Sequence, residues 1–78
     1  MKIAYYNVHL GTYGQTVKIV NGTKAYDVEF SFNKLDTDLV KILKEQEVSK
    51  LILFAPKVIY GHIVQLIRNA ELNIEIVN

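Results

Sequence analysis

Residues 15–32 read QTVKIVNGTKAYDVEFSF, and this stretch decides much of the fold. Asn21-Gly22 is the dipeptide best suited to a two-residue hairpin turn, because such turns need positive φ and match the twist of the flanking strands. The segment from Lys24 to Phe32 alternates apolar and polar residues, which is typical of a strand with one buried face. The sequence therefore predicts two antiparallel strands, from Gln15 to Val20 and from Lys24 to Phe32.

The segment before this hairpin indicates another strand. Residues from Lys2 to Leu10 are rich in Tyr, Ile and Val, and two glycines, Gly11 and Gly14, follow in the connecting loop. If alternate residues pack in the core, the inward set is Ala4, Tyr6, Val8 and Leu10. The outward set is Tyr5, Asn7 and His9, which would lie beside Thr16 and Lys18 or beside Val17 and Ile19, depending on the hairpin register.

Two helix-strand units account for the rest of the chain. Asp36 or Thr37 can cap a helix that ends near Glu47. The run from Leu51 to Phe54 has no alternation, as expected of a strand buried on both faces. Pro56 can start a second helix, whose apolar face would contain Ile59, Ile63, Leu66, Ile67 and Ala70, and the final strand would run from Leu72 to Val77.

Known connection rules turn this order of elements into a topology. Hairpins place consecutive strands side by side, and right-handed crossovers carry each helix to the next parallel strand. The sequence thus predicts a single α/β domain over residues 1–78, with the order β-β-β-α-β-α-β. Its mixed five-stranded sheet has the order 3-2-1-4-5, and both helices cover one face of it. The opposite face is left without a helix.

Composition and charge exclude several classes of protein. Apolar residues make up 50% of the 78 residues, and nine basic residues oppose eight acidic ones. This balance gives no long-range field for nucleic acid or an anionic membrane. The chain has no cysteine for disulfides or thiolate metal sites, and no segment approaches the roughly 20 apolar residues of a membrane span. We expect a soluble cytoplasmic protein without membrane contact, metal or cofactor.

The order of elements resembles the ribonuclease H-like fold over the whole chain. That resemblance implies two metal ions held by acidic residues on the first strand, in the first helix and near the end of the fourth strand. The first strand offers Tyr5, Asn7 and His9, and the fourth ends in the segment from Leu53 to Pro56, so neither supplies a carboxylate. The resemblance therefore implies a non-catalytic member of this fold.

A second resemblance covers the segment from Ser49 to Val77, in which Leu51 to Lys57 reads LILFAPK and is followed by Gly61 and an amphipathic helix. It is similar to the strand-turn-helix of bacterial relatives of the middle domain of translation release factors. This resemblance implies association with RNA or the ribosome as an alternative function.

Seven side chains are candidates for a functional site. His9 with Asp27 and Glu29 has the chemistry for acid-base catalysis, because histidine titrates near neutral pH. The ordinary interpretation, which the sequence favours, is a solvated or dimer-buried sheet face. The candidate ligand contacts are Tyr13 at a hairpin tip, Lys57 at a helix N-terminus, and Tyr60 and His62 in the same helix.

The sequence favours a non-enzymatic binding or regulatory module. Surplus apolar surface on the helix-free face predicts a homodimer, and the first hairpin is a candidate contact for a protein partner. The alternative is nucleotide or RNA binding at the carboxyl ends of the parallel strands, at residues 9–13, 33–36 and 56–60. Acid-base catalysis around His9 is a third hypothesis.

Overall fold

The elements follow one another in the predicted order. The computed structural model describes residues 1–78. Its strands are β1 (Lys2–Asn7), β2 (Gly14–Asn21), β3 (Lys24–Ser31), β4 (Lys50–Phe54) and β5 (Glu75–Val77). Its helices are α1 (Leu35–Glu45) and α2 (Lys57–Asn69), and the short 3-10 helix η1 (Phe32–Lys34) precedes α1.

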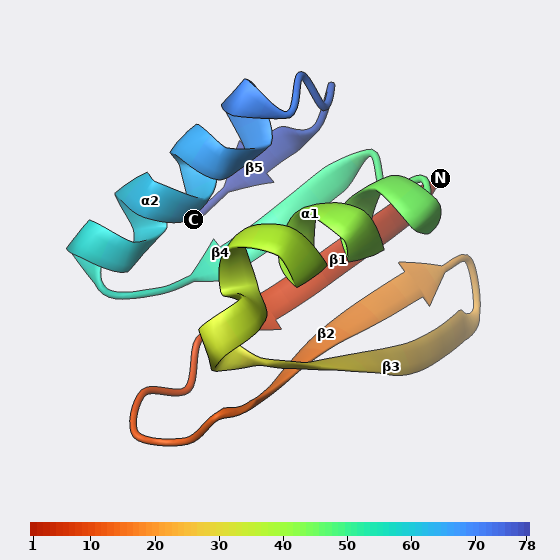
Figure 1. Ribbon diagram of the computed structural model, residues 1–78. Coiled ribbons are helices and arrows are strands. Elements are labelled where there is room, and N and C mark those ends of the chain that lie inside the picture. The colour runs from red at the N-terminus through yellow and green to blue at the C-terminus, as the bar shows by residue number, and fades with distance from the viewer.

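The five strands form one mixed sheet in the order β3-β2-β1-β4-β5. β1 is antiparallel to β2 and parallel to β4, while β3 and β5 form the two edges. Both helices cover the same face of the sheet (Figure 1). The predicted α/β fold class, strand order and placement of the helices are therefore confirmed, and the opposite face of the sheet has no helix on it.

The core lies between the sheet and the two helices. Its completely buried members include Ala4 and Tyr6 of β1, Leu51 and Leu53 of β4, and Ile63 of α2. The rings of Tyr6 and Phe30 meet edge to face, with their centroids 5.4 Å apart. Leu10, which we expected in this core, is 60% exposed, because β1 ends at Asn7 and the chain then leaves the sheet.

The turn between β2 and β3 is displaced by one residue from the prediction. Asn21 pairs with Lys24, so the central residues are Gly22 and Thr23. The φ angle of Gly22 is 62°, and Thr23 is not among the residues with positive φ. A type II′ turn needs positive φ only at its first central residue. Gly22 meets that need, and Asn21 is free to remain in the strand.

The N-terminus of α1 also differs from the prediction. Lys34 occupies the cap position and no side chain caps the helix, while Asp36 lies inside its first turn. Thr37 donates a weak hydrogen bond of 3.3 Å from Oγ1 to the carbonyl of Lys34. The expected caps are wrong because η1 leads directly into α1, so the preceding 3-10 turn takes the place of a side-chain cap.

The prediction of two buried faces for β4 is half right. Leu51 and Leu53 face the helices and are completely buried, whereas Phe54 is 54% exposed and Ile52 is half-buried. Their side chains lie on the face that no helix covers. The last strand is also shorter than expected, because β5 begins only at Glu75. Neither helix has the length and apolar character that crossing a membrane requires.

Candidate functional sites

The helix-free face of the sheet carries a continuous group of apolar side chains, which we call the apolar belt. Strand alternation puts these residues opposite the buried ones. The register places Ile3 beside Val20, Tyr5 beside Ile52, and Ile52 beside Val77. The apolar belt therefore consists of Ile3, Tyr5, Val20, Ile52 and Val77, and runs across β2, β1, β4 and β5.

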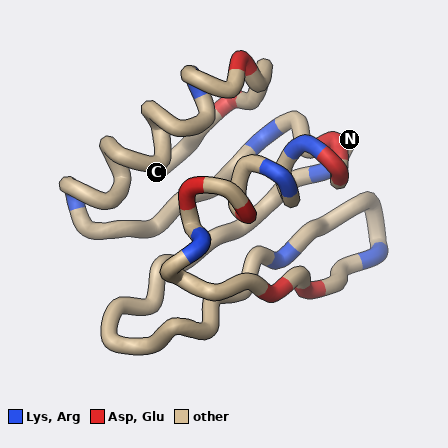
Figure 2. The backbone as a smooth tube through the Cα atoms, in the orientation of Figure 1, with Lys and Arg blue, Asp and Glu red and all other residues tan.

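The apolar belt is partly open to solvent, since Tyr5 is exposed and its other four members are half-buried. Tyr5 is 39% exposed, and the neighbouring Phe54 is 54% exposed at the end of β4. Charged side chains border the belt: Lys18 on β2, Asp27 and Glu29 on β3, Lys50 on β4 and Glu75 on β5. Figure 2 shows basic and acidic residues interspersed along the backbone, without a long basic stripe. This charge pattern suits a protein contact better than a nucleic-acid contact.

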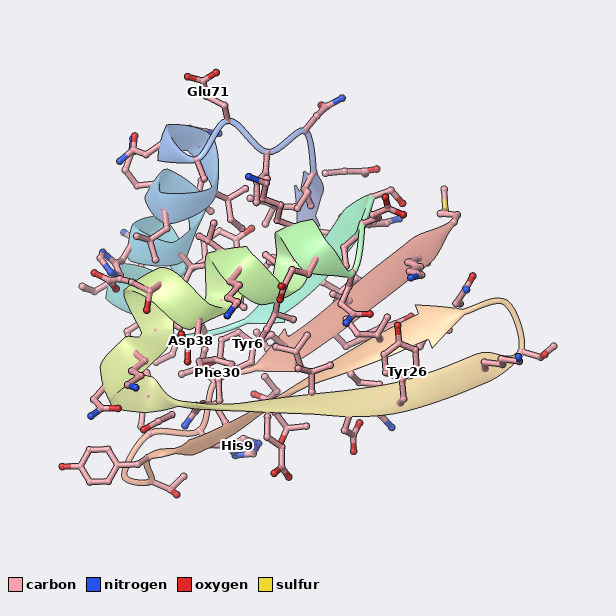
Figure 3. All side chains as sticks on the ribbon, turned by 45° about the vertical axis from the view of Figure 1, so that its right-hand side comes forward. Tyr6, His9, Tyr26, Phe30, Asp38 and Glu71 are labelled. Carbon is pink, nitrogen blue, oxygen red and sulfur yellow. The ribbon has the colours of Figure 1, made fainter.

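The three candidate catalytic residues all lie on the helix-free side of the sheet. His9 follows the end of β1 and points to the side of the sheet away from the helices (Figure 3). Asp27 lies opposite Lys18, and Glu29 lies opposite Thr16. In the first hairpin Tyr5 pairs with Lys18, so the outward residues of β1 lie beside Thr16 and Lys18, the first of the two registers that the sequence left open. The one ion pair in the structure joins other residues, so no salt bridge connects His9 to either carboxylate.

A buried glutamine holds the loop between β1 and β2. Gln15 is 1% exposed, and its Oε1 accepts hydrogen bonds from the Tyr6 hydroxyl at 2.9 Å and the His9 amide at 3.0 Å. Its Nε2 donates to the carbonyl oxygens of His9 at 2.8 Å and Thr12 at 2.9 Å. Both donors and both acceptor positions of the amide are thus used. Gln15 fixes the loop that carries His9 and Tyr13.

Sequence reasoning missed this role of Gln15, although a signal for it exists. Gln15 lies on the same face of β2 as Val17 and Ile19, both of which are completely buried. A polar residue in an inward register needs internal hydrogen-bond partners, because burial without them is unfavourable. The same environment affects its neighbour, since burial raises the pKa of Tyr6 from 10.0 to about 12.

A second candidate site lies between the N-terminal halves of α1 and α2. Nε2 of His62 lies 2.8 Å from Oδ1 of Asp36, and this pair lines a hollow of about 500 Å³. The remaining lining residues are Phe32, Asn33, Lys34, Leu35, Thr37, Val58 and Ile59. The side chains of His62 and Asp36 are 49% and 64% exposed, so solvent screens the interaction between them.

The four candidate ligand contacts do not converge on one site. Tyr13 is 75% exposed and lines a separate hollow with Gly11, Thr12 and Phe32. Tyr60 lines another hollow, formed with Ile67, Arg68 and neighbouring apolar residues. Lys57 is the first residue of α2 and lines none of the hollows. No group of three or more His, Cys, Asp or Glu side chains is arranged to hold a metal ion.

The fold and these surfaces define a small α/β domain with an uncovered apolar sheet face. Comparisons of the chain with protein-family models, with curated proteins and with solved structures found no match. The resemblance to the ribonuclease H-like fold therefore rests on the order of elements.

Proposed function

We propose that this protein is a non-enzymatic association module that forms a homodimer through its apolar belt. The observation that carries the proposal is the continuity of the belt across β2, β1, β4 and β5, on a face without a helix. Burial of apolar surface is the main favourable term in association, and an exposed contiguous patch with a polar rim is typical of an interaction site.

The distribution of charge on this face suits contact between identical copies. In a two-fold interface, residues near the axis meet their own counterparts, so charges there repel while apolar side chains pack. Tyr5 lies on the central strand β1, between Ile52 of β4 and Lys18 of β2. An axis through Tyr5 and Ile52 leaves both carboxylates of β3 at the rim. Tyr5 and Ile52 then lie at the centre of the interface, Lys18 borders this apolar centre, and the carboxylates lie further out, in keeping with the apolar core and polar rim of stable interfaces.

The first hairpin supplies a separate contact for a protein partner in this proposal. Tyr13 is 75% exposed, and the loop that carries it is fixed by the hydrogen bonds of Gln15 to His9 and Thr12. An aromatic side chain on a pre-ordered loop offers a large contact area, and little further entropy is lost when it binds.

Sedimentation velocity over a range of protein concentrations tests the dimer. We expect the natural protein to sediment as a dimer at micromolar concentration and Ile52→Lys to sediment as a monomer, because the lysine places a charge in the centre of the interface. Val58→Lys is the matched control, because Val58 is 84% exposed on α2, away from the belt. A monomeric natural protein, or an equal effect of both variants, would count against the proposal.

The hollow beside His62 supports a second candidate function, the binding of a small ligand such as a nucleotide. Its volume of about 500 Å³ falls within the range of about 300–1,000 Å³ typical of ligand pockets. Nε2 of His62 lies within hydrogen-bond distance of Oδ1 of Asp36 at this hollow. The net charge of +1 gives RNA no comparable support.

A thermal-shift screen with a nucleotide panel tests this second function. We expect any stabilising nucleotide to lose its effect in His62→Ala. Lys57→Ala should weaken that effect more than the control Lys44→Ala, because Lys57 begins the helix that carries His62 while Lys44 lies in the last turn of α1. If no nucleotide raises the melting temperature, this function is wrong.

A further inference from the structure

One edge of the sheet is long and open. β3 occupies the end of the strand order and pairs only with β2. It has eight residues, contains no proline, and most of them are exposed. Natural proteins usually shorten or protect such edges, because the free amide and carbonyl groups along them can pair with another strand.

The hairpin register identifies the backbone groups that face the open edge. Asn21 and Lys24 flank a two-residue turn, so they form a hydrogen-bonded pair, and hydrogen-bonded and non-bonded pairs then alternate along the ladder. The bond of 2.6 Å from the Phe32 amide to the Tyr13 carbonyl continues this alternation. The residues that direct their N–H and C=O groups away from β2 are therefore Ala25, Asp27, Glu29 and Ser31.

The two faces of this edge differ in chemistry. Asp27 and Glu29 project from the helix-free face and are exposed, and neither belongs to an ion pair. On the other face, Val28 is half-buried and Tyr26 is 40% exposed, with its hydroxyl bonded to the side chain of Gln46. A strand added here meets carboxylates on one face and apolar surface on the other.

The same carboxylates oppose pairing of β3 with a second copy. A two-fold axis makes such a pair antiparallel. It sets the odd-numbered residues of one copy opposite odd-numbered residues of the other, because these residues direct their backbone groups outward. If the pair is centred on Val28, Asp27 of one copy lies opposite Glu29 of the other. If it is centred on Asp27 or on Glu29, that carboxylate lies opposite the same carboxylate of the second copy. Like charges directly opposite each other are destabilising. The edge is therefore unsuited to self-association and complementary to a basic strand.

We propose that β3 receives an extended segment of another protein as an added strand. In that segment, Lys or Arg at alternate positions faces Asp27 and Glu29, and apolar residues between them lie beside Tyr26 and Val28. The outward backbone groups supply affinity, and the alternating side chains supply specificity. This contact is distinct from the apolar belt and does not depend on dimer formation.

The test uses a short synthetic peptide of alternating lysine and valine as the probe. A peptide of the same composition, with its lysines and valines in separate blocks, controls for charge alone. We expect the alternating peptide to bind more tightly and to slow the hydrogen exchange of the amides of Ala25, Asp27, Glu29 and Ser31. Equal binding of the two peptides, absence of binding, or unchanged exchange at these amides would overturn the proposal.

A charge-reversal variant completes the test. We expect the double variant Asp27→Lys with Glu29→Lys to weaken binding of the alternating peptide about tenfold or more, since two attractive cross-strand pairs become repulsive. The control, Glu45→Lys with Glu71→Lys, changes net charge equally at exposed positions outside the sheet and should bind normally. Equal weakening in both variants would show non-specific attraction and contradict the proposal.

Discussion

The Tyr6 hydroxyl donates a hydrogen bond of 2.9 Å to Oε1 of Gln15, and both side chains are almost completely inaccessible to solvent. The pair links the central strand β1 to the start of β2. Through its other bonds, Gln15 also fixes the backbone at His9 and Thr12. The core and the exposed loop that presents Tyr13 are therefore one structural unit.

Replacing Gln15 by leucine should destabilise the protein strongly. The change removes the partner of four polar groups, namely the Tyr6 hydroxyl, the His9 amide, and the carbonyls of His9 and Thr12. We expect the free energy of unfolding to fall by about 2–4 kcal/mol. Urea unfolding measures this loss. Gln65→Leu is the control, because the exposed amide of Gln65 bonds only to Asn69, and a comparable loss there would contradict our account.

Alkaline pH should destabilise the fold through Tyr6. Because burial raises the pKa of Tyr6 from 10.0 to about 12, its contribution to stability is complete below pH 10 and is lost as the pH rises toward 12. We expect the free energy of unfolding to fall by about 2–3 kcal/mol over this pH range. Denaturant unfolding at several pH values should show a steeper decline for the natural protein than for Tyr6→Phe, which has no such proton. Parallel declines would show that Tyr6 is not responsible.

Gly61→Ala should stabilise the protein. Gly61 lies inside α2, which begins at Lys57, and a Cβ at this position meets nothing within 4 Å. We expect a gain of about 1 kcal/mol in the free energy of unfolding. Gly22→Ala provides the contrast, because its φ of 62° disfavours any other residue. Thermal unfolding should separate the two variants in opposite directions.

The pair of His62 and Asp36 should contribute little to stability. Both side chains are about half exposed, which limits such a pair to about 0.2–1 kcal/mol. A double-mutant cycle with His62→Ala and Asp36→Ala measures the coupling at neutral pH. A coupling well above this range would mean that the contact holds α1 and α2 together, rather than simply lining the hollow.

The order of elements and the sheet topology were predictable from the sequence because they depend on patterns that tolerate local error. The alternation from Tyr26 to Phe30 and the apolar run at Leu51 fix which segments are strands, and connection rules then restrict their order. Element ends were less predictable. β1 stops at Asn7 because the backbone at His9 bonds to the side chain of Gln15. The inward register of Gln15 indicates that it is buried, but it does not indicate which partners it bonds to.

The candidate sites were predictable only in part. Alternation correctly placed Tyr5 on the helix-free face. Its neighbour on β2 is Lys18, which belongs to one of the two registers that the sequence allowed. The proximity of Asp36 and His62 depends on how α1 and α2 pack, so these distant positions gave no signal of it. The open edge of β3 likewise becomes visible only when the strand order is combined with the hairpin register.

Association through the apolar belt can be tested by intermolecular nuclear Overhauser effects in a mixture of isotope-labelled and unlabelled protein. We expect contacts between the Tyr5 ring of one copy and the methyl groups of Ile52 or Val77 of the other. A monomeric sample, or intermolecular contacts confined to the helices or to the edge of β3, would contradict it.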